Sequence, residues 1–297
     1  MKDYKKYSPI SFWSWNDKLE PEILKKQIQW MSEHGIGGFF MHARSGLATD
    51  YLSEEWMECI EACAKEAERL NMQAWIYDEN GWPSGFVGGK LLEEENNRDQ
   101  YITYKIGTYD STATVNYLLE GDNLRRVVEG DSDGEYLNLY IKIATSTADI
   151  LNPDVVDQFI ELTHEAYQKR FGQQFSEKID GFFTDEPQYH RWATPYTKMI
   201  QEYFEEQYGE DILDSLGLLF VEKEGYRSFR YRYWKGMQTL MLRNFAERVY
   251  NWCDEHGAKL TGHYIEETTL GYQNMCCAGT MPFYEYEHIL VSFLCME

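Results

Sequence analysis

The first 90 residues alternate between short β-rich runs and amphipathic helical stretches, and this alternation limits the possible folds more than any other feature. Strand patterns occupy residues 10–16, 35–44 and 72–79, and helical patterns run from Glu20 to Gly35 and from Ser53 to Asn71. Ser53 is a suitable helix N-cap, because its hydroxyl can accept a backbone N–H of the first turn. Successive strand–helix units predict a parallel sheet with helices on its outer side.

The alternation breaks after the third strand. Residues 101–106 and 136–143 show β-type periodicity and are separated by Gly-containing turn signals, which predicts an antiparallel insertion. The strand–helix rhythm resumes at Asn152, where an N-cap is followed by proline. We expect three regions: residues 1–100 with the first βα units, residues 101–146 with the β insertion, and residues 147–297 with the remaining units and a helical insertion near 194–256. Two more strands are expected at residues 179–185 and 259–265.

The chain has 297 residues, and its 50 Asp and Glu against 28 Lys and Arg give a formal net charge of −22. This excess repels phosphate backbones and anionic lipids, which disfavours nucleic-acid and membrane-surface partners. No apolar stretch reaches the roughly 20 residues that span a bilayer, and no export signal follows Met1, so we expect a cytoplasmic protein. The same acidic balance fits a neutral or cationic partner better. The chain also has 9 Trp, 23 Tyr and 15 Phe, several of them beside acidic residues.

All five predicted parallel strands end in polar or acidic residues. In a parallel barrel the loops that follow the strands converge at the carboxyl ends, where catalytic residues collect. Surface loops are usually polar in any case, and that alternative stays open. The strand-end residues are Trp15-Asn16, His42-Ala43-Arg44, Tyr77-Asp78-Glu79, Thr184-Asp185-Glu186 and His263 to Glu267.

The segment Asp185-Glu186-Pro187 is the local sequence feature that most specifically indicates catalytic chemistry. Side chains alternate along a strand, so a regular strand would turn the two acids to opposite sides and only one would act. We assign Glu186 as the general acid, because a carboxyl among aromatic residues is kept neutral by desolvation. Asp185 would then hold neighbouring groups by hydrogen bonds, unless both acids are only a salt-bridged strand end.

A sugar site needs aromatic platforms beside carboxylates, amides or other hydrogen-bonding groups. Each tryptophan taken alone is more often part of a core than a platform. We expect platforms from Trp13, Trp15 and Trp82, and hydroxyl contacts from Asn16, His42, Arg44, Asp78 and Glu79.

A last cluster consists of His263, Glu266 and Glu267. If the strand continued that far, His263 and Glu267 would share one face, which favours Glu267 over Glu266 for chemistry. A metal site formed by His42, His263 and nearby acids is possible in principle, but the chain has no HExxH or comparable spacing. A core or hydrogen-bonded histidine is the simpler interpretation for both residues.

Four motifs follow one another along the chain: Phe12-Trp13-Ser14-Trp15-Asn16, Tyr77-Asp78-Glu79 through Trp82-Pro83-Ser84-Gly85, Phe183-Thr184-Asp185-Glu186-Pro187 and Leu260-Thr261-Gly262-His263. Together they resemble the α-L-rhamnosidase-like glycoside hydrolases, the group around glycoside hydrolase family 106. The resemblance runs from about Pro9 to His288, and it implies a TIM-like (β/α) barrel that acts on glycosidic bonds, with calcium in some members.

The expected fold class is therefore α/β: a TIM-like barrel with an antiparallel β insertion after the third strand. Five clear strands, with one or two more within residues 281–295, fall short of the eight of such a barrel, so we expect it to be incomplete. Related chains continue with further barrel units where this one stops, which indicates C-terminal truncation. Exposed sheet edges would then favour a homo-oligomer.

Glycosidases usually need two carboxyls that flank the bond. The second carboxyl would lie in the C-terminal part that related chains have and this one lacks. Among the residues present, Glu267 is the best candidate for the second carboxyl. We therefore expect a glycoside hydrolase with Glu186 and Glu267 as catalytic residues, or a catalytically inactive carbohydrate-binding remnant of one. An isomerase or aldolase on the same barrel is a third alternative, and the lack of a strand-end lysine counts against its Schiff-base form.

Overall fold

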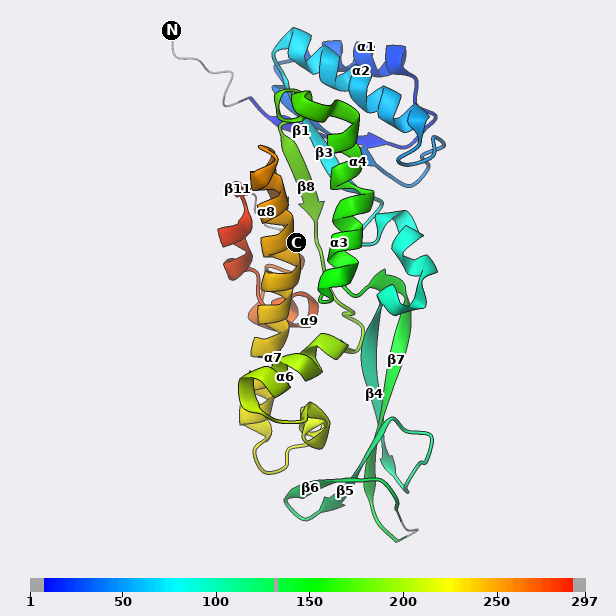
Figure 1. Ribbon diagram of the computed structural model, residues 1–297, viewed down its shortest axis with the longest axis vertical. Helices are drawn as coiled ribbons and strands as arrows, with labels where there is room; N and C mark the ends of the chain where they lie inside the picture. Colours follow the sequence, from blue (N-terminus) through cyan, green and yellow to red (C-terminus); the bar gives the residue numbers. More distant parts are fainter. Residues whose placement is uncertain (1–7, 131–132, 291–297) are drawn as a thin grey trace.

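A parallel sheet is the centre of the computed structural model, which describes residues 8–130 and 133–290 (Figure 1). Its strands lie in the order β1-β2-β3-β8-β10-β11, and every neighbouring pair is parallel. This order follows the chain once the strands of the insertion are skipped, as in a barrel. The described residues nevertheless form an open sheet, so closure of the expected barrel is not confirmed. The strands are β1 (Ile10–Trp15), β2 (Gly38–Ala43), β3 (Gln73–Asn80), β8 (Gly181–Asp185), β10 (Lys259–His263) and β11 (Ile289–Leu290).

Helices cover one face of this sheet, as the strand–helix alternation predicts. Ser53 caps α2, with its hydroxyl accepting the backbone N–H of Trp56 at 3.2 Å, and Asn152 caps α3 in the same way. In Figure 1, α3, α4 and α8 lie along β8. The helices are α1 (Pro21–Glu33), α2 (Glu54–Leu70), α3 (Pro153–Leu162), α4 (His164–Phe171), α5 (Phe175–Lys178), α6 (Lys198–Tyr208), α7 (Tyr226–Met241), α8 (Glu247–Glu255) and α9 (Leu270–Cys276). Within the described ranges, no helix combines the length and apolarity needed to cross a membrane.

The sheet separates two groups of buried side chains. The larger core lies between the sheet and the helices and includes Phe39, Ile60 and Phe182. The opposite, inner face carries a small aromatic cluster of Phe40, Trp75, Tyr77 and Phe183. All six residues of β2 are buried, which is typical of a parallel strand covered on both faces.

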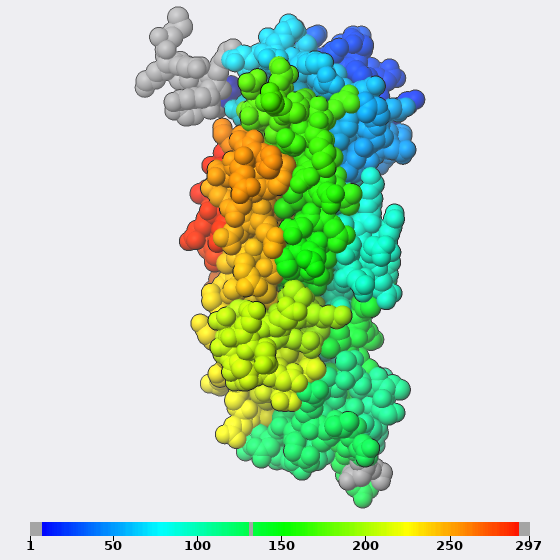
Figure 2. Space-filling view, in the orientation of Figure 1, coloured from blue at the N-terminus to red at the C-terminus, as the bar shows by residue number. Residues whose placement is uncertain are grey.

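The insertion forms a second, antiparallel sheet in the order β6-β5-β7-β4-β9. Residues 194–196 were expected to begin a helical tract, but they form β9, because their backbone pairs with residues 100–102 of β4. The ladder extends away from the parallel sheet, and α6 packs beside it in the elongated molecule (Figures 1 and 2). The strands are β4 (Arg98–Gly107), β5 (Val115–Glu120), β6 (Asn123–Val127), β7 (Tyr136–Ala148) and β9 (Thr194–Tyr196).

Gly262 permits the close pairing of β8 and β10. A Cβ atom at this position would lie 2.2 Å from the carbonyl oxygen of Thr184 and 2.7 Å from its methyl group. The pairing sets His263 directly opposite Asp185 in the register of the two strands. The glycine therefore fixes the geometry at the carboxyl ends of both strands.

Candidate functional site

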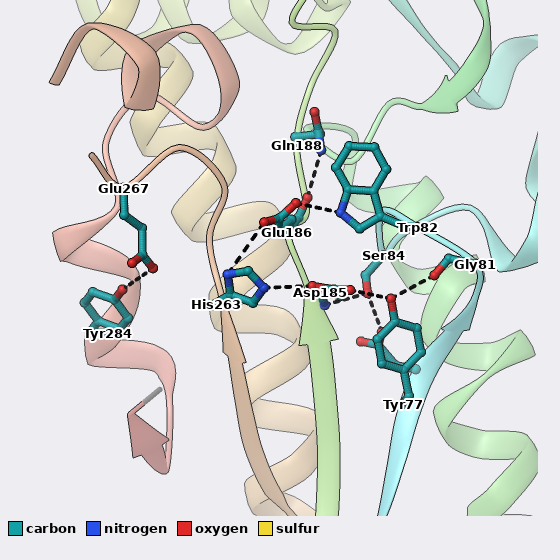
Figure 3. A network of polar contacts seen from close by, with 11 residues as sticks. Tyr77, Gly81, Trp82, Ser84, Asp185, Glu186, Gln188, His263, Glu267 and Tyr284 are labelled. Carbon is teal, nitrogen blue, oxygen red and sulfur yellow. Dashed lines mark hydrogen bonds and ion pairs between the residues drawn. The ribbon is translucent and has the colours of Figure 1, made fainter. Parts of the chain in front are cut away.

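Two carboxyls and an imidazole meet where β8 and β10 end (Figure 3). Nε2 of His263 lies 2.9 Å from Oδ1 of Asp185, and its Nδ1 lies 3.7 Å from Oε1 of Glu186. The hydroxyl of Tyr77, on β3, donates to Oδ2 of Asp185 at 2.6 Å. Three adjacent strands therefore supply one polar cluster at the carboxyl end of the sheet.

The expectation that Asp185 and Glu186 face opposite sides is wrong. It assumed a regular strand, but β8 ends at Asp185 and Glu186 has a positive φ of 47°. This left-handed conformation is uncommon outside glycine and often occurs at functional sites. It turns the side chain of Glu186 back toward His263, so that both acids share one site.

Trp82 contacts Glu186 from the loop after β3. Its indole N–H donates to Oε2 of Glu186 at 2.6 Å, and its side chain remains 39% exposed. Ser84, in the same loop, accepts the backbone N–H of Asp185 at 2.8 Å. The loop thus fixes the end of β8 through the bond to Asp185 and one carboxyl oxygen of Glu186 through the bond from Trp82.

The two neighbouring acids have pKa values shifted in opposite directions. Burial raises the pKa of Glu186, and the negative charge of Asp185 acts in the same direction, against the opposing effects of His263 and Trp82. Burial also acts to raise the pKa of Asp185, but the bonds from His263 and Tyr77 outweigh it and the pKa falls below its ordinary value. Such divergence distinguishes a proton donor from a residue that stays ionised.

A cavity of about 270 Å³ opens in front of Glu186. Its lining includes Trp82, Glu186, Arg191, His263, Glu266 and Glu267. Carboxyls predominate over cations in this lining, and the exposed indole of Trp82 flanks them. The arrangement suits a polar, uncharged ligand that offers hydroxyl groups and an apolar face.

Glu267 lies in this cavity, but a different local structure places it there. β10 ends at His263, and residues 265–268 form a turn, so the expected continuation of the strand to Glu267 is wrong. The hydroxyl of Tyr284 donates to Oε1 of Glu267 at 2.7 Å. Figure 3 shows the carboxyl of Glu267 directed toward Tyr284.

Comparison with solved structures bears on the fold that carries this site. The structure of a rhamnosidase from Novosphingobium sp. PP1Y matches with a TM-score of 0.68 over 96% of this chain. The chain has a rhamnosidase-like fold. Sequence identity is 10%, and the chain spans 48% of the rhamnosidase's length. No family model and no curated protein matches the sequence.

Trp13 and Trp15 lie away from the cavity in front of Glu186, contrary to the sequence prediction. Both face the helix-covered side of β1, where Trp15 is only 2% exposed and packs against Trp56. The indole N–H of Trp13 donates to Gln27 of α1 at 2.9 Å. The alternate residue Phe12 is the one that contacts the inner aromatic cluster.

Asp78 and Glu79 are buried and engaged within the protein, so the predicted hydroxyl contacts are wrong for both. The hydroxyl of Ser84 donates to Oδ1 of Asp78 at 2.5 Å, and burial raises the pKa of Asp78 well above its ordinary value. Glu79 accepts backbone N–H groups from residue 80 and from residues 85–88. Burial raises the pKa of Glu79 to about 7, against the effect of these bonds. Both acids stabilise the loop that carries Trp82.

The predicted residues at the ends of β1 and β2 occupy different environments. His42 is buried on the inner face and stacks on Tyr77 at 3.6 Å between ring centroids. Burial, with a smaller effect from Arg44, lowers the pKa of His42 to about 4, so the ring is neutral near pH 7. Neither ring nitrogen has a hydrogen-bond partner. Asn16 and Arg44 are exposed, and their contact with a ligand stays a prediction.

Sequence reasoning missed two residues that line or border the cavity. Arg191 enters it from the loop after β8 and lies 3.6 Å from Glu266. Trp192, the next residue, stacks on the guanidinium of Arg191. Their position only a few residues after the acidic strand end was a signal that could have identified them. Glu266, which was set aside in favour of Glu267, also lines the cavity.

The calcium implied by the resemblance does not fit the cluster at the end of β8. Ligand atoms of Asp185, Glu186 and His263 lie within 4.8 Å of one another, and no other such group occurs among the described residues. Calcium prefers six to eight oxygen ligands, whereas this set offers one nitrogen and two carboxyls. The carboxyl oxygens of Asp185 are also taken by His263 and Tyr77.

Proposed function

We propose that this chain is a glycoside hydrolase-like protein that acts on a glycosidic substrate in the cavity before Glu186. The observation that carries the proposal is the pair of neighbouring acids, Asp185 and Glu186, whose pKa values are shifted in opposite directions around His263. Glycosidases use a protonated acid beside ionised carboxylates. The rhamnosidase-like fold supports the same class of activity.

In this proposal Glu186 donates its proton to the glycosidic oxygen as the bond to the leaving group breaks. Its raised pKa, caused first by burial, favours the protonated form that a general acid needs more than an ordinary glutamate does. Asp185 stays ionised and orients His263, which in turn lies beside the other oxygen of Glu186. Trp82 fixes the carboxyl by its N–H and offers an exposed ring to the apolar face of a sugar.

Glu267 is the proposed partner of Glu186. It lines the same cavity, and its carboxyl would act as base toward water or as nucleophile toward the anomeric carbon. Tyr284 would orient it through the 2.7 Å hydrogen bond. Asn16 and Arg44, which are exposed, remain candidates for hydroxyl contacts at the neighbouring strand ends.

The test is release of sugar from a panel of phenyl glycosides that includes the α-L-rhamnopyranoside, because phenol, unlike nitrophenol, leaves poorly unless its oxygen is protonated. Glu186→Gln should lower kcat by at least about 100-fold, because general acid catalysis contributes a factor of this order. Glu33→Gln, an exposed acid on α1, is the matched control and should leave turnover unchanged. Unchanged turnover in Glu186→Gln would reject this residue as the acid.

A carbohydrate-binding protein without turnover is the second candidate. It is favoured by the extent of the match, because the chain spans about half of the rhamnosidase's length and the whole enzyme's activity need not reside in it. Calorimetry that detects sugar binding, together with no release from the glycoside panel, would favour this candidate. Binding that disappears in Trp82→Ala would locate it in the same cavity.

A further inference from the structure

The loop after Glu186 joins the two sheets of the molecule. The side-chain amide of Gln188 donates to the carbonyl oxygen of Glu186 at 3.2 Å. The loop ends in β9, which pairs with β4 of the antiparallel sheet. The residues between these ends are therefore held at both sides.

Two aromatic residues fasten the middle of this loop. The backbone N–H of Tyr189 donates to the carbonyl oxygen of Cys276 at 3.1 Å, and Tyr189 is 2% exposed. The ring of His190 stacks on Tyr101 of β4, with 4.3 Å between ring centroids and 14° between planes. The two residues that follow are thus presented from a fixed segment.

Trp82, Arg191 and Trp192 form a continuous surface that we name the ledge. The guanidinium carbon of Arg191 lies 5.4 Å from the ring centroid of Trp82 and 4.5 Å from that of Trp192. Both distances are within the range of cation–π contacts. Glu266 lies 3.6 Å from Arg191 and holds it from another side. The ledge begins at the indole that binds Glu186, continues through Arg191, which lines the same cavity, and ends at the exposed Trp192.

Trp192 is 80% exposed, although its ring is held in place by Arg191. An indole of this size exposed beside a polar cavity is typical of a binding surface, because burying it against a ligand would release its apolar area from water. The neighbouring guanidinium adds N–H donors, which hydroxyl groups can satisfy. A ring with an apolar face and hydroxyl edges therefore matches the ledge better than a wholly apolar group does.

We propose that the ledge is a second sugar subsite, so that the preferred substrates are oligosaccharides of at least two rings. This inference rests on the proposed function, in which Glu186 protonates the oxygen between two rings. The ring that leaves with that oxygen then lies on the side of Glu186 where Trp82, Arg191 and Trp192 are found. Trp192 is a specificity-determining residue, and it takes no part in the bond cleavage.

Calorimetry on Glu186→Gln, which keeps the pocket without its acid, tests the subsite with matched ligand pairs. Each pair is a methyl glycoside and a disaccharide that ends in the same sugar, with rhamnose, fucose and galactose as that sugar. For the sugar that binds, the disaccharide should bind at least about 10-fold more tightly, the effect of about 1.4 kcal/mol that one stacked ring supplies. Adding Trp192→Ala should abolish this gain in affinity for the disaccharide and leave the affinity for the methyl glycoside unchanged.

Two further variants separate stacking from damage to the fold. Trp192→Tyr should retain most of the gain, because it keeps an aromatic face. Trp30→Ala removes another exposed tryptophan, on α1, and should leave the gain unchanged. Equal affinity for the two members of a pair would overturn the subsite and leave the proposed function standing. Failure of every ligand to bind would overturn both.

Discussion

Nε2 of His263 lies 2.9 Å from Oδ1 of Asp185, which makes this imidazole the link between the two carboxyls at the end of β8. The other ring nitrogen faces Glu186 at 3.7 Å. A positive charge on the ring therefore stabilises both carboxylates. The protonation of Glu186 depends on this contact and on the hydrogen bond from Trp82.

Removing the indole N–H should extend the active pH range toward alkaline values. The hydrogen bond from Trp82 favours the charged form of Glu186, so Trp82→Phe should raise the pKa of this carboxyl further. The protonated acid would then persist to higher pH. We expect the alkaline limb of kcat/KM to move upward by about 1 pH unit, since a hydrogen bond to a charged group is worth at least about 1.5 kcal/mol and one pKa unit corresponds to about 1.4 kcal/mol.

The pH profile of cleavage of a phenyl glycoside, whose leaving oxygen needs protonation, measures this shift. Trp30→Phe, a substitution of the same kind on α1, should not move the profile. An alkaline limb that moves to lower pH in Trp82→Phe would contradict the assignment of Glu186 as the acid.

Asp99 should make the protein less stable as the pH rises. It is 2% exposed, and Nδ1 of His190 lies 3.9 Å from Oδ1 of its carboxyl. Burial raises its pKa from 3.8 to about 8. A group with a raised pKa in the folded state contributes stability at low pH, and this contribution is lost as the pH increases from about 4 to about 8.

Asp99→Asn keeps the neutral form at every pH. It should raise the melting temperature by at least about 4 °C at pH 9 and change it little at pH 3.5. Calorimetric melting across this range provides the measurement, and Asp122→Asn, at an exposed turn, is the control. A variant less stable than the wild type at pH 9 would show that the charged form of Asp99 is the stabilising one.

Glu79 should be essential for the loop that carries Trp82. Glu79→Ala leaves the backbone N–H groups of residues 80 and 85–88 without their acceptor, inside a buried loop. A loss of about 3 kcal/mol in the free energy of unfolding is expected. Urea denaturation measures it, and Glu94→Ala, an exposed acid nearby, should cost less than about 0.5 kcal/mol. Equal stability of the two variants would refute the role given to Glu79.

Gly262→Ala should disrupt the pairing of β8 and β10. The added methyl group would meet the carbonyl oxygen of Thr184 at 2.2 Å, and a backbone atom cannot rotate away. We expect at least about 3 kcal/mol of destabilisation and loss of sugar binding, because His263 moves relative to Asp185. Gly107→Ala, at the end of β4 with open space around it, should have little effect. Far-ultraviolet circular dichroism with urea compares the two variants.

The sequence predicted the parts of the molecule that depend on local patterns. The cap at Ser53, the early βα units and the antiparallel insertion follow from periodicity and turn chemistry, and all three are present. The site at the ends of β8 and β10 was also expected from polar strand ends. Its assembly in one cluster follows from the parallel register that sets His263 opposite Asp185.

Other features depend on contacts that local patterns do not encode. Alternation in β1 separates Trp13 and Trp15 from Phe12, but it does not say which set faces the helices. The left-handed backbone of Glu186 breaks the strand alternation of side chains at the residue that we assign as the acid, so the sequence pattern placed its side chain on the wrong side. Arg191 reaches the cavity through a loop anchored in both sheets, so its position depends on residues far apart in the chain.

The backbone N–H groups around Glu79 have a consequence for anionic ligands such as phosphorylated compounds. Successive N–H groups that converge on one point are the usual receptor for a phosphate group. Here the receptor is already filled by an acid from the adjacent strand, so a phosphorylated compound would have to displace a side chain covalently tied to the same chain. The anion-binding site of this loop is thus occupied by the carboxylate of Glu79, and its glycine-rich backbone binds that side chain instead of a nucleotide phosphate.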